Sequence, residues 1–198
     1  SSKFSVLALA FFAVPLIIEM EEVLTIWLKD DIPPFTLKLA QYILLLSITY
    51  QYSVGIMSAI QATGKIRNYQ IAMGIILLMN IPIAYAILKM GYPVYYTTIA
   101  FVILELIALC VRLIMANRLT GMSVKEYILN VIQPTMIIIA IPMIVAMIPH
   151  FVMSQSFLKL VIVCTIYGLL FAVLMFRFAF DETQREHIKS KIQHFLKR

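Results

Sequence analysis

Charged side chains are scarce in this sequence. Asp, Glu, Lys and Arg make up 13% of its 198 residues, whereas soluble domains carry about 25%. Residues 39–61 and 71–88 contain no charge at all, and each run approaches the roughly 20 apolar residues that cross the hydrocarbon layer as a helix. Hydrophobic residues account for 62% of the chain, and the mean hydropathy is +0.94. The composition excludes a soluble globular fold and indicates an all-α integral membrane protein.

The sequence also lacks the motifs of common enzymes. It contains no H-E-x-x-H, no G-x-S-x-G and no Gly-rich phosphate loop. His150 has no acid at helical spacing, so we expect it to be a simple interfacial histidine. The two cysteines, Cys110 and Cys164, lie in apolar stretches and are typical of small core residues. We therefore expect no catalytic site, no metal site and no cofactor in this chain.

The apolar runs predict about six transmembrane helices in one lobe, residues 1–180. Residues 19–28 carry three glutamates beside an apolar stripe, so we expect this piece to tip into the membrane interface, with Trp27 as an anchor. The chain begins at Ser1 without a cleavage pattern, which favours a segment of a longer protein over a signal peptide. The expected spans are residues 4–18 (or 4–27), 35–62, 69–88, 94–115, 127–148 and 157–178.

Lys and Arg are unevenly distributed between the two sides of the membrane. With the loops alternating sides, one side carries twelve of these residues and the other carries Lys29, Lys38, Lys89 and Lys159. Cytoplasmic loops are enriched in Lys and Arg, so both termini are expected in the cytoplasm. Residues 181–198 are predicted to form a basic amphipathic tail that contacts anionic lipid headgroups. Topology thus accounts for the net charge of +6, and nucleic acid is not an expected partner.

Polar residues recur along one face of the span at residues 35–62. Ser47, Gln51, Gly55, Ser58 and Ala62 are three or four residues apart. Small and polar residues allow membrane helices to pack closely and to form hydrogen bonds with one another. Alternatively, Gln51 and Ser58, with Tyr50 or Tyr52 nearby, line a water-filled cavity that binds sugar hydroxyls. The pattern supports both interpretations.

Glu105 lies near the centre of the span at residues 94–115. An acid at this depth is costly and normally faces protein or water. Arg112 follows on the same face, but the two residues are about 10 Å apart along the axis, so we expect their side chains to bridge only part of the gap, through water. Glu105 is either a buried structural acid or a substrate or proton site.

Asn80 and Pro82 interrupt the span at residues 69–88. Proline lacks a backbone N–H and kinks a helix. A polar side chain beside a kink suits either a static bend or a helix that bends during transport.

Four local patterns occur in order along the chain: Trp27 within residues 26–30, residues 62–69 (ATGKIRNY), residues 78–83 (LMNIPI) and residues 89–91 (KMG). Taken together, they resemble the C-terminal half of bacterial polysaccharide and O-antigen flippases, which share a superfamily with the multidrug and toxin extrusion transporters. The resemblance covers nearly the whole chain.

The resemblance implies one lobe of a two-lobed, alternating-access carrier in the bacterial inner membrane. The substrate would be an undecaprenyl-diphosphate-linked oligosaccharide for surface polysaccharide such as lipopolysaccharide, and the other lobe would be N-terminal. The basic loop with Lys65 and Arg67 would lie where the diphosphate loads. The family's cavity tends to be cationic, whereas we expect no basic residue beside Glu105 in this lobe. Two alternatives remain: an ion-coupled multidrug exporter, and a membrane scaffold for glycan synthesis that transports nothing.

Overall fold

The computed structural model describes residues 2–29, 32–154 and 156–179, and all regular structure in these ranges is helical. Five of the helical segments are long and apolar enough to cross a membrane, and the bent pair at the N-terminal end adds a sixth. The prediction of an all-α membrane protein with about six spans is confirmed. The elements are α1 (Ser2–Ile18), α2 (Met20–Leu28), α3 (Thr36–Ala62), α4 (Arg67–Leu78), α5 (Asn80–Lys89), α6 (Tyr95–Thr120), α7 (Val124–Tyr127), the π-helical turn η1 (Ile128–Ile132), α8 (Gln133–Val152) and α9 (Phe157–Phe178).

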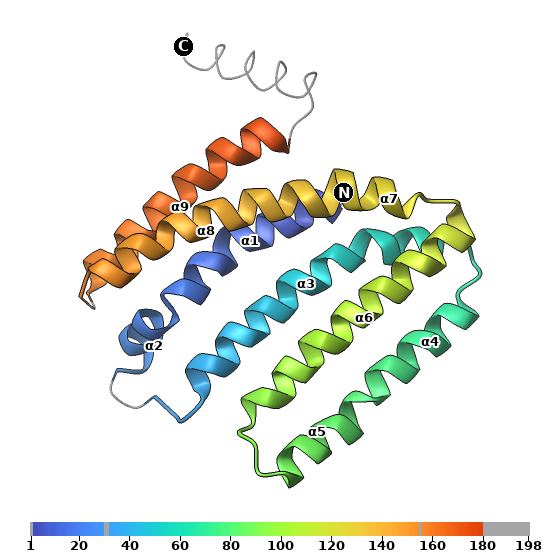
Figure 1. Ribbon diagram of the computed structural model, residues 1–198, viewed down its shortest axis with the longest axis horizontal. Coiled ribbons are helices and arrows are strands. Elements are labelled where there is room, and N and C mark those ends of the chain that lie inside the picture. Colours follow the sequence, from blue (N-terminus) through green and yellow to red (C-terminus); the bar gives the residue numbers. More distant parts are fainter. Residues whose placement is uncertain (1, 30–31, 155, 180–198) are drawn as a thin grey trace.

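The long helices lie side by side (Figure 1). α3 packs between α1 and α6, while α8 and α9 pair with each other and contact α1. α4 and α5 flank α6 at the opposite edge. The core lies between α1 and α3, where Leu7, Ala10 and Ile56 are buried. Because α3 also packs against α6, polar side chains on the facing sides of these two helices meet inside the protein.

α1 ends in a sharp bend. The axes of α1 and α2 differ by 77°, and Glu19 stands between them. The bend agrees with the expectation that residues 19–28 leave the direction of the first span, and Trp27 projects from α2 with 77% of its surface exposed. Two glutamates of this segment are buried, however, which the amphipathic pattern did not predict.

Proline explains two further irregularities. Because Pro82 has no N–H to donate to the carbonyl of Leu78, the span Arg67–Lys89 breaks at Met79 into α4 and α5. The span is therefore interrupted at the position where the sequence predicts a kink. Pro134 likewise cannot donate to Asn130, and the preceding turn widens into η1, where the N–H of Gln133 bonds to the carbonyl of Ile128.

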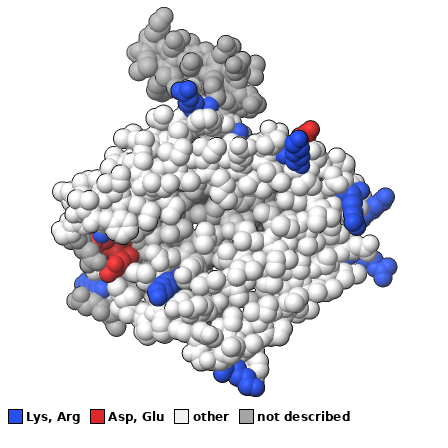
Figure 2. Space-filling view, viewed as in Figure 1, with Lys and Arg blue, Asp and Glu red and all other residues white. Residues whose placement is uncertain are grey.

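Most of the outer surface is apolar. The face in Figure 2 has a broad uncharged middle, and its Lys and Arg side chains lie mainly near the edges. Large side chains such as Ile75, Ile81 and Leu169 are exposed around the protein. A surface of this kind suits a lipid environment. The predicted tail at residues 181–198 falls outside the described residues.

Candidate substrate cavity

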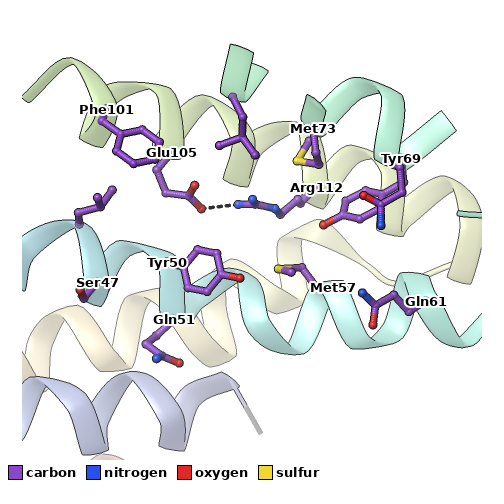
Figure 3. Close-up of a pocket in the computed structure, with 13 residues that line it drawn as sticks. Ser47, Tyr50, Gln51, Met57, Gln61, Tyr69, Met73, Phe101, Glu105 and Arg112 are labelled. Carbon is purple, nitrogen blue, oxygen red and sulfur yellow. Dashed lines mark hydrogen bonds and ion pairs between the residues drawn. The ribbon is translucent and has the colours of Figure 1, made fainter. Parts of the chain in front are cut away.

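A cavity of about 470 Å³ opens between α3, α4 and α6. Its walls combine amides, a serine hydroxyl and two phenol rings with apolar side chains (Figure 3). A volume of this size is typical of small-molecule sites, about 300–1,000 Å³. The lining residues are Leu46, Ser47, Tyr50, Gln51, Met57 and Gln61 from α3, Tyr69, Gln70, Met73 and Leu77 from α4, and Phe101, Glu105 and Arg112 from α6.

Glu105 and Arg112 form a buried ion pair in the wall of this cavity. Nη1 of Arg112 is in direct contact with Oε1 of Glu105, and the two residues are only 3% and 4% exposed. The expectation that no basic residue lies beside Glu105 is therefore wrong. Helical side chains lean toward the helix N-terminus, so the long guanidinium of Arg112 runs back along α6 and closes the gap without water.

Ser53 of α3 completes the contact between the two helices. Arg112 donates to Oγ of Ser53 at 2.8 Å, and that hydroxyl lies 3.4 Å from Oε1 of Glu105, to which it donates. Ser53 is fully buried. Unpaired charges are costly in a low-dielectric interior, and this arrangement supplies each charge with a partner.

Arg112 is held from a third direction by an aromatic ring. Its guanidinium carbon lies 5.9 Å from the centre of the Tyr50 ring, a cation–π distance. Nε of Arg112 is buried, and among the described residues it has no hydrogen-bond partner. Tyr50 is 41% exposed and faces the cavity (Figure 3). The guanidinium thus keeps one buried donor without a partner among the described residues.

The structure brings together three of the five predicted intramembrane site residues. Gln51, Glu105 and Arg112 line the cavity. Ser58 does not, because it is exposed and its hydroxyl donates to the carbonyl of Val54 on its own helix. Asn80 is also absent from the lining and lies at the break between α4 and α5.

The predicted loading residues lie just outside the cavity. Both residues are exposed: Lys65 lies in the turn that joins α3 to α4, and Arg67 is the first residue of α4. Gln61 before this turn and Tyr69 after it both line the cavity. Lys65 and Arg67 are therefore near cavity-lining residues in the sequence, but they do not form part of the cavity wall.

The polar face of α3 is divided between the cavity and the contact with α1. Ser47 and Gln51 line the cavity, whereas Gly55 packs against α1, where its N–H donates to Oγ of Ser2 at 3.0 Å. Tyr52 faces away from the cavity and shares a 2.9 Å hydrogen bond with Thr135 of α8.

Sequence reasoning missed two contributions to this site. Ser53 lies off the polar stripe and gave no signal beyond being a hydroxyl in an apolar run. Tyr69 and Met73 of α4 could not be assigned to the cavity, because that requires knowing that α4 packs beside α6.

A second group of ionisable residues lies at the bend between α1 and α2. Glu19 is 2.8 Å from Nδ1 of His150 and 3.3 Å from Nζ of Lys159, and Glu22 is 3.5 Å from the same Nζ. His150, which was expected to be a simple interfacial residue, therefore has a carboxylate partner from a distant part of the chain. Lys159, which was counted with the charges on the less basic side of the membrane, is almost fully buried.

No family model, curated protein or solved structure matches the chain.

Proposed function

We infer that this protein moves lipid-linked oligosaccharides across the bacterial inner membrane by alternating access, as one lobe of a two-lobed flippase. The observation that carries the proposal is a cavity inside a membrane protein whose wall holds a buried, hydrogen-bonded Glu105–Arg112 pair. Ionisable groups at such positions mark substrate or ion pathways. The order of motifs along the chain supports the same function.

The chemistry of the cavity wall suits a sugar better than a lipophilic cation. Gln51, Gln61 and Gln70 offer both donors and acceptors, and Ser47 adds a hydroxyl. The ring of Tyr50 provides a flat apolar face of the kind that packs against the C–H face of a sugar. Oligosaccharides present many hydroxyls around apolar ring faces, so this mixture of groups is complementary to them.

The Glu105–Arg112 pair determines which part of the protein would bind the diphosphate. Arg112 is neutralised by Glu105, so this lobe offers no free cation in the cavity wall among the described residues. A diphosphate would then be bound chiefly by the N-terminal lobe, with Lys65 and Arg67 near the entrance. Both termini of this chain would lie in the cytoplasm.

Two other functions are less well supported. An ion-coupled multidrug exporter needs an acid that can release its ion, but Glu105 is held by Arg112 and Ser53. A scaffold for glycan synthesis needs no polar cavity, whereas this one is lined by four groups able to bond to a ligand: Ser47, Gln51, Gln61 and Gln70.

The proposal is tested in a strain that lacks the gene and has no second flippase. Lipid-linked oligosaccharide should accumulate, surface polysaccharide should fall, and the full-length protein should restore both. Gln51→Ala is expected to restore export poorly at a normal protein level. Ser58→Ala, which alters an exposed hydroxyl outside the cavity, should restore it fully. Normal surface polysaccharide in the deletion strain rules the function out.

A further inference from the structure

The buried cluster at the bend between α1 and α2 joins three parts of the chain. Glu19 and Glu22 come from the bend and α2, His150 from the end of α8, and Lys159 from the first turn of α9. Glu19 is 1% exposed, and Glu22 and Lys159 are also buried, so the cluster reaches the protein surface mainly through His150, whose side chain is 28% exposed.

The charges of this cluster balance only when it holds an extra proton. With His150 neutral, two carboxylates face a single ammonium, which leaves one negative charge buried. With His150 protonated, the four side chains sum to zero. An uncompensated buried charge strongly destabilises the contacts around it. Oε2 of Glu19 and Oε1 of Glu22 also lack a well-directed hydrogen bond among the described residues, so the ammonium alone does not satisfy them.

Among the residues that the structure describes, the elements packed around the cluster supply no further charge. Glu21 is exposed on α2, away from the cluster. α3 presents the neutral amide of Gln41, which donates to the carbonyl of Ile17, while Lys38 stands over the ring of Tyr95 on α6.

On α9, the remaining ionisable group near Glu19 is the thiol of Cys164. The proton is therefore shared by Glu19, Glu22, His150 and Lys159.

We propose that these four residues form a one-proton site that locks the α1–α2 bend onto the α8–α9 hairpin. Proton binding through His150 neutralises the cluster and holds α2 against α9. Proton loss leaves a net negative charge that weakens these contacts and frees α2 to move. The site is distinct from the cavity between α3, α4 and α6, and its action does not depend on what the cavity carries.

The test measures the distance between α2 and α9 as a function of pH. Spin labels are placed at Trp27 and Leu169, which are both exposed, in the full-length protein in lipid nanodiscs with Cys110 and Cys164 replaced by alanine. Distances are recorded from about pH 5.5 to about pH 8.5, a range that spans ordinary histidine titration. We expect a population with a longer α2–α9 distance to grow as pH rises, by up to about tenfold per pH unit for one proton.

Neutralising one carboxylate should abolish this response. In Glu19→Gln, a single carboxylate faces Lys159 and the cluster is neutral without the extra proton, so the short distance should persist at the high end of the pH range. Glu22→Gln makes the same charge change and replaces Glu19→Gln as the test variant if Glu19→Gln fails to fold. Glu21→Gln, on the exposed side of α2, is the matched control and should respond like the unmodified protein.

Three results would overturn the proposal. The first is a wild-type distance that does not change with pH, and the second is a full response retained in both Glu19→Gln and Glu22→Gln. The third is a short α2–α9 distance at high pH in sodium buffer together with a long distance in choline buffer. That result would assign the site to a metal cation instead of a proton. A label pair at Ile43 and Ile114, on α3 and α6, should not respond in any of these conditions.

Discussion

Arg112 reaches back along α6 to contact Glu105, and Ser53 of α3 bonds to both. The pair therefore links the two helices that form most of the cavity wall. Its position gives it two roles, because the charges that shape the cavity also hold α3 against α6. The two roles are separable by experiment.

Removing one charge of this pair should destabilise the protein. Glu105→Gln leaves the guanidinium of Arg112 buried without a counter-charge, and such changes cost about 3–5 kcal/mol. The double variant Glu105→Gln/Arg112→Met removes both charges and should recover most of the loss. Thermal unfolding of the purified full-length protein measures the three stabilities. Additive losses in the double variant would contradict a direct pair.

The close approach of α1 and α3 at Gly55 gives a second prediction. A Cβ at this position would lie 2.1 Å from Oγ of Ser2, so Gly55→Ala should lower stability by about 1–3 kcal/mol. Gly74→Ala on α4 is the matched control, because nothing lies within 4 Å of its added Cβ. That change should be neutral or raise stability by up to about 1 kcal/mol. Equal effects in a thermal unfolding assay would refute the predicted close packing.

The hydrogen bond between Tyr52 and Thr135 ties α3 to α8. A double-mutant cycle with Tyr52→Phe and Thr135→Val should give a coupling energy of about 0.6 kcal/mol, and at most about 1.7. Unfolding of the four proteins measures it. Tyr85→Phe, at an exposed position on α5, should have no effect on stability. Zero coupling between Tyr52 and Thr135 would show that the bond contributes nothing.

The distribution of Lys and Arg predicts which loops are cytoplasmic. A single cysteine at Lys65 should resist an impermeant maleimide in intact cells, and one at Ser156 should react. Both are made in a background without Cys110 and Cys164. Gln155, next to Ser156, lies outside the described residues. Labelling at Lys65 with protection at Ser156 would invert the proposed topology.

The fold was largely predictable because apolar run length is a local property. The span at residues 157–178 coincides with α9, and Pro82 marked the break between α4 and α5. The predicted ends of helices were less accurate. α6 was expected to end at residue 115 but continues to Thr120. It stops there because Gly121 adopts a left-handed conformation.

The candidate site was only partly predictable. Glu105, Arg112 and Gln51 were identified because polar residues are costly in an apolar span. Their partners depend on how helices pack and which way side chains lean, which run length does not reveal. The cluster of Glu19, His150 and Lys159 escaped prediction for the same reason, since more than a hundred residues separate the bend from the other two.

The central claim is tested most directly by measuring transbilayer movement of lipid-linked oligosaccharide. Full-length protein is reconstituted into vesicles that contain the lipid, and movement is followed by the fraction of sugar accessible to an added glycosidase. We predict rapid equilibration with the wild type and with Ser58→Ala, and at least a several-fold slower rate with a Tyr50→Ala/Gln51→Ala variant that inserts normally. Equal rates in protein-free vesicles and in vesicles with the wild-type protein would contradict the account.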